Sequence, residues 1–277
     1  MSRRPHGDRG SAVVAAVFAA AAFALLADQI VHTSRSALQS ASAEEARGQL
    51  EADAEAGLAI AVDGLTAADS AKRWGLADGP HSTVFNGANL EIRVEDERGK
   101  ISLNTITEAQ LQKLFDKAGA PAQTVPDLVA AFLNFRDPGR LNGAAADAGA
   151  GGFVSVEQLA QVPGMTPALY AAIVPAVTVS NGNAPFDPRY AAPLALEVMA
   201  QGPGGEVAAI ERSRELAGER PALSGSDEEA LVGRAVTVRV TARDADGGLE
   251  KTAILEFTGR PDHPYVVRKQ TDSSPAA

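Results

Sequence analysis

Cysteine is absent from this sequence, and aromatic residues and histidines are scarce. The 277 residues contain no cysteine and only 5% aromatic residues. A chain without cysteine has no disulfide scaffold, no thiolate zinc site and no cysteine nucleophile. The histidines show no metal-ligand spacing, and neither a G-x-S-x-G nor a Walker sequence is present. The histidines are His6, His32, His81 and His263.

Positive charge is also in deficit. The chain has 25 Lys and Arg against 35 Asp and Glu, a formal net charge of −10 and a pI near 4.9. Proteins that bind nucleic acid usually present a basic surface, so this class is disfavoured. The composition, 45% hydrophobic and 22% charged, is typical of a globular protein. The many alanines favour helix.

The chain begins with a basic segment and a long apolar run. Residues 1–10 include three arginines and one aspartate, and residues 11–27 contain no charged side chain. As a helix this run would measure roughly 26 Å at about 1.5 Å per residue. Three interpretations fit: a Sec signal peptide cleaved near Ala27, an ordinary membrane anchor, or a prepilin-type leader cleaved after Gly10. The arginines predict a cytoplasmic N-terminus and an exported body in both anchored cases.

The pattern after the apolar run predicts a long amphipathic stem. No proline occurs between Ser36 and Leu65, and apolar or small residues recur every three or four positions. This spacing places them on one helical face. We therefore expect the apolar run and the stem to form one helix of about 50 residues. The residues of this face are Ala43, Ala46, Leu50, Ala54, Leu58, Ala61 and Leu65.

The remaining patterns predict an α+β protein in which helices interrupt a sheet. Residues 74–88 are rich in turn formers and are expected to break the helix. The last seven residues are expected to be disordered. Strands are predicted over 90–94, 101–103, 235–241, 252–257 and 265–267, and helices over 108–118, 127–135, 156–161, 167–174, 191–200 and 206–216.

One helical pair resembles a helix-hairpin-helix. Residues 156–174 have this shape, but residues 153–180 contain Glu157 and no basic residue. Without cations the contact with phosphate is lost, so we expect this hairpin to pack against protein. The segment 202–205 is interpreted as a turn between helices, and residues 244–248 as a hairpin turn.

Two carboxylates are candidates for a calcium site. Asp137 and Asp147 lie beside and within the glycine-rich residues 141–152. Calcium prefers six to eight oxygen ligands, so two carboxylates would need backbone carbonyls as well. We predict no cofactor and no other metal site, and calcium at Asp137 and Asp147 is kept as a candidate only.

Taken together, these stretches resemble the minor pseudopilin K family of the type II secretion system. The order and spacing of the similar stretches, over most of the chain, make the resemblance specific. They are Arg9-Gly10-Ser11, Ala54–Leu58 with Trp74, Gly99–Thr105 (GKISLNT), Phe135-Arg136-Asp137, Ser155–Leu159 with Gly164–Pro167, Val177–Val179 and Pro264–Val267.

The resemblance implies a pilin-like fold: a long N-terminal helix packed on a small antiparallel sheet, with a large inserted α-helical subdomain containing helix-hairpin-helix-like units. It implies that prepilin peptidase cleaves after Gly10 and that the new N-terminus at Ser11 is methylated. It also implies a single-pass inner-membrane protein with a cytoplasmic N-terminus and a periplasmic body. The expected partners are minor pseudopilins I and J, assembled at the pseudopilus tip, and the expected role is not enzymatic.

The apolar run is then expected to contact membrane lipid and partner helices. Its small side chains allow close helix approach. Ala15 would stand at mature position five, where most pilins carry a glutamate that pairs with a neighbour's amine. A carboxylate in the membrane is costly unless it is paired, and a capping subunit has no subunit above it to pair with. The predicted packing residues are Val13, Val14, Ala15, Val17 and Phe18.

The expected division of the chain has seven parts. The alternative function is an exported helix-hairpin-helix DNA-binding protein of the competence type, and a secreted enzyme is a further rival. The parts are a leader (1–10), a transmembrane helix (11–31), a stem (32–73), a first sheet segment (74–103), an inserted helical subdomain (104–217), C-terminal strands (218–270) and a tail (271–277).

Overall fold

The computed structural model divides the chain into two compact units, Met1–Ala52 and Asp53–Ala277. The residues described are 9–69, 71–76, 79–138, 151–181, 184–199, 210, 212, 231–245, 247–260 and 262–274. Within the first helix, side chains are described for residues 16–18 and from residue 39 onward.

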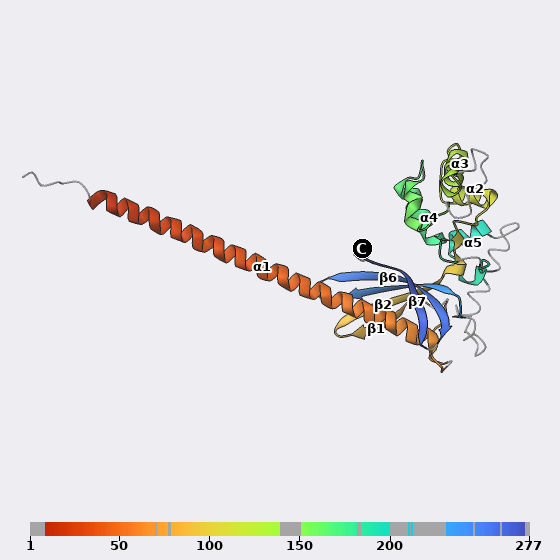
Figure 1. Ribbon diagram of the computed structural model, residues 1–277, viewed down its shortest axis with the longest axis horizontal. Helices are drawn as coiled ribbons and strands as arrows, with labels where there is room; N and C mark the ends of the chain where they lie inside the picture. Colours follow the sequence, from red (N-terminus) through yellow and green to blue (C-terminus); the bar gives the residue numbers. More distant parts are fainter. Residues whose placement is uncertain are drawn as a thin grey trace, which may run out of the picture. The chain divides into compact units, whose positions relative to one another are not determined.

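The first helix, α1 (Arg9–Thr66), is continuous over 58 residues (Figure 1). It contains residues 32–66 of the predicted stem and ends seven residues before the predicted limit of residue 73, since the described residues 67–69 and 71–76 are not helical. The absence of proline and the many alanines explain why the helix is not interrupted.

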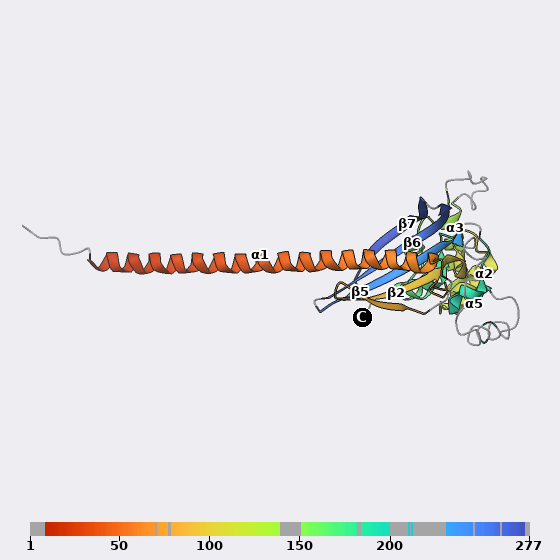
Figure 2. The same cartoon turned by 90° about the horizontal axis from the view of Figure 1, so that it is seen from below.

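The second unit contains a five-stranded antiparallel sheet with the order β1-β2-β5-β6-β7. Figure 2 shows β2, β5, β6 and β7 side by side. The strands are β1 (His81–Phe85), β2 (Ala88–Asp96), β5 (Ala235–Arg243), β6 (Gly248–Arg260) and β7 (His263–Ser273).

The C-terminal part of α1 covers one face of this sheet. Ala54, Leu58, Ala61 and Leu65 are buried, which confirms the predicted apolar face over this part of the stem, whereas Ala43 is exposed and Ala46 is half-buried. Strand residues of alternate positions meet it, among them the fully buried Val236, Val238 and Val240. At Gly57, an added Cβ would lie 2.5 Å from Val240 Cγ1, so a glycine lets the helix approach the strand closely.

Trp74 fixes the chain where it leaves α1. Its backbone N–H donates to the Gly64 carbonyl at 2.8 Å, and its ring lies so close to Gly64 that a Cβ there would overlap it. On its other side the ring stacks on His81 of β1, with centroids 3.7 Å apart. The connection from helix to sheet is therefore held by aromatic stacking over a glycine.

A helical block lies between β2 and β5 in the sequence, and Figure 1 shows α2, α3, α4 and α5 gathered together. Its own core includes Leu111, Phe115, Phe132, Ile173 and Leu196. Its elements are η1 (Glu97–Gly99), β3 (Ile101–Ser102), α2 (Glu108–Lys117), α3 (Val125–Arg136), η3 (Val156–Gln161), α4 (Pro167–Ile173), η4 (Val174–Ala176), β4 (Val177–Thr178), η5 (Pro188–Tyr190) and α5 (Pro193–Met199).

Local sequence signals set the starts of these helices. Thr107 and Gln110 form a capping box at the start of α2. Thr166 caps α4, and Pro167 occupies its first turn, where the missing N–H costs nothing. Gly164 has φ +88°, a left-handed conformation that favours glycine, in the turn before α4.

The predicted α+β fold class is confirmed, with four differences in detail. β1 was expected to be a turn region, but its residues pair with β2. Residues 156–161 form a 3₁₀ helix, so the first arm of the expected helix-hairpin-helix is not an α-helix. The strand predicted over 101–103 is two residues long, Ile101–Ser102, and pairs in parallel with β4. β7 continues to Ser273, so residues 271–273 of the expected tail are a strand.

Two predictions fall largely outside the described residues. The turn at 202–205 lies outside them. Of the helix predicted over 206–216, only Ile210 and Arg212 are described, and both are helical.

Candidate functional site at the junction of sheet and helical block

The chain leaves the sheet for the helical block at the end of β2, and two consecutive carboxylates are buried there. Asp96 and Glu97 are each 2% exposed. A buried carboxylate is costly unless it is paired and hydrogen-bonded. The partners of these two groups therefore show what holds sheet and block together. We call this region the junction.

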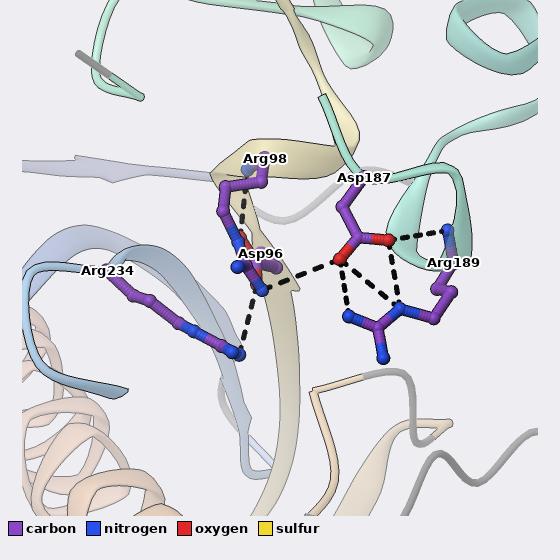
Figure 3. A network of polar contacts seen from close by, with 5 residues as sticks. All are labelled: Asp96, Arg98, Asp187, Arg189 and Arg234. Carbon is purple, nitrogen blue, oxygen red and sulfur yellow. Dashed lines mark hydrogen bonds and ion pairs between the residues drawn. The ribbon is translucent and has the colours of Figure 1, made fainter. Parts of the chain in front are cut away.

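Asp96 is paired with two arginines (Figure 3). Its Oδ1 accepts a hydrogen bond from the Arg98 backbone N–H at 2.9 Å, and its Oδ2 lies 2.8 Å from Arg98 Nη2. Arg234 Nη1 lies 3.6 Å from the same Oδ2. Arg234 directly precedes β5, so Asp96 joins the two strands from which the helical block departs and to which it returns.

Asp187 carries the same network into the helical block (Figure 3). It caps η5 by accepting from the Arg189 N–H, pairs with Arg189 Nη2 at 2.7 Å, and lies 3.8 Å from Arg98 Nη2. Burial alone would raise the pKa of Asp187, but hydrogen bonds from Arg189 and the charge of Arg98 lower it. The carboxylate is therefore ionised at neutral pH.

Arg98 links the two carboxylates. Burial would lower the pKa of Arg98, but the hydrogen bond and charge of Asp96, together with Asp187, raise it. Its guanidinium also lies 5.5 Å from the centroid of the Tyr190 ring. Gly99 is packed so tightly that a Cβ would overlap the Tyr190 carbonyl. This explains why a glycine precedes Lys100 in the GKISLNT stretch.

Glu97 forms the second half of the junction. Its Oε1 accepts from Lys100 Nζ at 2.7 Å and from Thr237 Oγ1 of β5 at 2.7 Å, and its Oε2 accepts from Thr178 Oγ1 of β4. Its oxygens thus meet one cation and two hydroxyls, one from the sheet and one from the helical block. These contacts offset the cost of burying the charge.

Lys100 is shared between two carboxylates. Its Nζ lies 2.9 Å from Glu95 Oε2 as well as near Glu97. Burial would lower the pKa of Lys100, but the charges of Glu97 and Glu95 raise it. Burial would likewise raise the pKa of Glu95, and Lys100 lowers it. Lys100 and Glu95 are therefore both charged near neutral pH.

Two residues of the stretches that resemble the pseudopilin K family, Asn104 and Arg136, form hydrogen bonds within the helical block. Asn104 Nδ2 donates to the Phe153 carbonyl at 2.9 Å, and Asn104 Oδ1 accepts from the Phe153 N–H at 2.7 Å. Arg136 Nη1 donates to the Ile106 carbonyl at 2.8 Å. These residues act through packing and hydrogen bonding within the fold.

A cleft of about 1030 Å³ separates the helical block from the sheet face opposite α1. An ion pair between Lys269 of β7 and Glu157 of η3 joins its two walls. Burial would raise the pKa of Glu157, but the hydrogen bond from Lys269 lowers it. Arg268 pairs with Glu256 at 2.7 Å, so charges on the sheet wall are also compensated. The lining includes Glu95, Tyr170, Pro175, Arg239, Glu250 and Ile254.

The calcium candidates are not brought together by the described structure. Asp137 follows α3, and its Oδ2 lies 3.0 Å from Arg136 Nε. Asp147 lies outside the described residues. Among the residues that are described, no three His, Asp or Glu side chains are grouped as metal ligands would be.

The predicted processing and packing residues all lie in the first 18 residues. Gly10 and Ser11 stand in the first turn of α1, and their side chains, with those of Val13, Val14 and Ala15, lie outside the described part. Val17 and Phe18 are 63% and 72% exposed.

Across the part of the chain that is described, no helix combines the length and apolarity needed to cross a bilayer. Most side chains of the predicted membrane segment 11–31 lie outside that part.

Sequence reasoning missed the junction. The run Glu95–Lys100 (EDERGK) places three acidic residues directly before two basic ones at a strand end, which is the one local sign of it. Arg234, Thr237 and Asp187 give no such sign, because each joins the junction from a distant part of the chain.

No family model matches the chain, and no curated protein matches it. Among solved structures, it is similar to a chain in the crystal structure of the GspK-GspI-GspJ complex from the enterotoxigenic Escherichia coli Type 2 Secretion System. The TM-score is 0.55 at 14% sequence identity, over 84% of this chain and 99% of that chain. The sequence resemblance to pseudopilin K is thus matched by a likeness of fold to a chain of the GspK-GspI-GspJ complex.

Proposed function

We propose that this chain is a non-enzymatic minor pseudopilin of a type II secretion system, of the K type. The observation that carries the proposal is the helical block inserted between β2 and β5, adjacent strands of a sheet whose other face packs on α1. A chain of the GspK-GspI-GspJ complex has a similar fold over 99% of its length. Three residues of the matching stretches lie in this insertion: Gly99 at its base, and Asn104 and Arg136 inside it.

The proposed place of the chain is the tip of the pseudopilus, beside minor pseudopilins I and J. A bulky block attached to one end of the sheet would obstruct a subunit stacked above it. Because Ala15 stands at mature position five, the chain lacks the carboxylate that would pair with the N-terminal amine of a neighbouring subunit above it. A capping subunit accommodates both features.

The proposed anchor is residues 11–31, with the N-terminus cytoplasmic and the body periplasmic. Prepilin peptidase would cleave after Gly10 and leave a methylated Ser11. The apolar side chains of Val17 and Phe18 would then be available to membrane lipid and to partner helices.

No observation favours the DNA-binding alternative. The hairpin segment 153–180 has no basic residue. Arg98, Arg189 and Arg234 lie in the junction and face carboxylates of this chain, so they do not form a phosphate-binding surface.

The mass of the protein recovered from bacterial membranes tests the proposed processing. We expect loss of residues 1–10 and an added methyl group on Ser11. Gly10→Val is expected to leave the chain uncleaved, whereas Gly7→Val, a matched change inside the leader, is expected to leave cleavage intact. Loss of all residues through about Ala27 would instead indicate signal-peptidase cleavage and contradict the anchored model.

Co-purification tests the partners. The full chain, extracted in detergent, is expected to retain pseudopilins I and J expressed from the same secretion system. Asp96→Ala, which disrupts the base of the helical block, is expected to reduce retention, whereas Glu91→Gln, at a half-buried position of β2 outside the junction, is expected to have no effect. Failure of the natural chain to retain either protein would overturn the proposal.

A further inference from the structure

The two edges of the five-stranded sheet differ in how they are protected. A strand at a sheet edge exposes unpaired backbone groups, and proteins usually protect such an edge with charges, proline or bulges. β7 has all three: Pro264, the charged residues Arg268, Lys269 and Asp272, and two register shifts against β6. β1, with the sequence HSTVF, has no proline and no Asp, Glu, Lys or Arg, and its pairing with β2 is regular.

β1 is also exposed. Ser82, Thr83, Val84 and Phe85 are all exposed, and the large apolar Val84 and Phe85 are 68% and 43% accessible. Within the described residues, β2 is the one strand paired with β1. An apolar, uncharged and regular edge of this kind is suited to pairing with another strand.

The hairpin turn determines which backbone groups face outward. Asn86 and Gly87, at φ 50° and 92°, form a two-residue turn between Phe85 and Ala88. In such a hairpin the flanking pair exchanges hydrogen bonds, and bonded and non-bonded pairs then alternate along the strand. Phe85, Thr83 and His81 therefore bond to β2, and the N–H and C=O groups of Ser82 and Val84 point to the open edge.

We propose that β1 pairs antiparallel with β1 of a second copy of this chain, about a two-fold axis at Thr83. In this register Ser82 lies opposite Val84 of the other copy, and each such pair exchanges both backbone hydrogen bonds. Thr83 lies opposite Thr83 of the other copy, and this pair exchanges no backbone hydrogen bonds between the two copies. Two five-residue edges can thus satisfy all their outward backbone groups without a shift or a bulge.

The composition of the strand selects a second copy as the occupant. Two identical strands across a two-fold axis place like charges near each other, and like charges on opposite strands are destabilising. β1 has no such charges. The neighbouring Glu91 is paired with Arg93 on its own strand at 2.6 Å, so its charge is compensated too. The contact is far smaller than a standard interface of about 1,600 Å², so we expect weak, concentration-dependent association.

This inference is independent of the proposed function, and the absence of cysteine makes it directly testable. At a non-hydrogen-bonded antiparallel pair the Cα atoms are about 4.5 Å apart, within the range that a disulfide spans. The full chain with Thr83→Cys, purified in detergent and mildly oxidised, is expected to form a disulfide-linked dimer on a non-reducing gel. The matched control is Thr271→Cys on β7, also an exposed threonine, which is expected to stay monomeric.

Two further variants test the register and the charge argument. Ser82→Cys is expected to cross-link much less than Thr83→Cys, because the two Ser82 positions face Val84 and not each other. Thr83→Lys places two ammonium groups opposite each other and is expected to weaken self-association about fivefold in sedimentation, with no change for Thr271→Lys. Equal cross-linking at positions 83 and 271, no dimer at 83, or cross-linking of 83 only to another protein would each overturn the proposal.

Discussion

The two faces of the sheet are covered in different ways. On the face toward α1, Ile92, Val236, Val238 and Val240 are fully buried against the helix. On the opposite face, the helical block is attached through the Glu97–Lys100 half of the junction and is separated further along by a cleft. One attachment is apolar and continuous, and the other is polar and confined to one end.

This difference indicates a division of roles. Apolar burial is non-directional and supplies most of the stability of a fold. Buried, hydrogen-bonded charges contribute less net stability, but they require a defined geometry. We infer that α1 stabilises the sheet, and that the junction fixes the direction in which the helical block leaves it.

The largest effect is expected from an equivalent truncation on the two faces. Ile92→Ala removes a fully buried side chain from the α1 face and should lower the free energy of unfolding by about 2–5 kcal/mol. Ile254→Ala, on a half-buried isoleucine of the cleft face, should cost clearly less. Urea denaturation of the two variants measures both values. Equal losses would show that the faces do not differ as described.

A smaller effect is expected at the junction. Asp96→Asn keeps the shape of the side chain but removes the charge that faces Arg98 and Arg234. Hydrogen bonds to charged groups contribute about 1.5–3 kcal/mol each, so a loss of roughly 2 kcal/mol is expected. Hydrogen exchange should rise in the helical block more than in α1. Uniform exchange across both parts would argue against an orienting role for the junction.

The junction should also be sensitive to acid, unlike the apolar face. The pKa of Asp187 is lowered from its ordinary 3.8 by Arg189 and Arg98, against the effect of burial. Its contribution is therefore present above the ordinary pKa and is lost as the pH falls below about 4 toward the lowered value. Hydrogen exchange near η5, measured after transfer to acid, should increase in this window. Asp187→Asn should remove the pH dependence at that place, and persistence of the dependence would contradict the assignment.

The smallest effect is expected for the ion pair across the cleft. Lys269→Gln removes the contact with Glu157, and both side chains are at least one-third exposed. Exposed pairs contribute about 0–1 kcal/mol and are screened by salt. The variant should match the natural chain in stability at high salt and fall slightly below it at low salt. A large loss at both salt concentrations would show that this contact, and not the junction alone, holds the block.

The sequence predicted the fold where the signal is local and periodic. The three-to-four spacing from Ala54 to Leu65 predicted the buried face of α1, and the alternation from Ala235 to Thr241 predicted β5. β1 was missed because its residues are nearly all exposed and show no alternation of burial. β4 was missed because two residues carry no periodicity.

The junction could be predicted only in part, for a different physical reason. The charges of residues 95–100 are visible in the sequence, but their partners are not. Thr237 reaches Glu97 across 140 positions, and Thr178 reaches it across 81. Such pairs are brought together by the path of the sheet and the return of the helical block, which no local pattern encodes.

The reciprocal bonds between Asn104 and Phe153 have a consequence for engineering. Beside them, Gly151 lies so close to the Arg136 carbonyl that an added Cβ would be 2.6 Å from its oxygen. The segment between Arg136 and Gly151 therefore starts and ends at nearly the same point. Doubling the length of a closed loop costs only about 0.6 kcal/mol. An epitope or a small reporter domain with adjacent termini could be inserted there, which would label the helical block without altering its core.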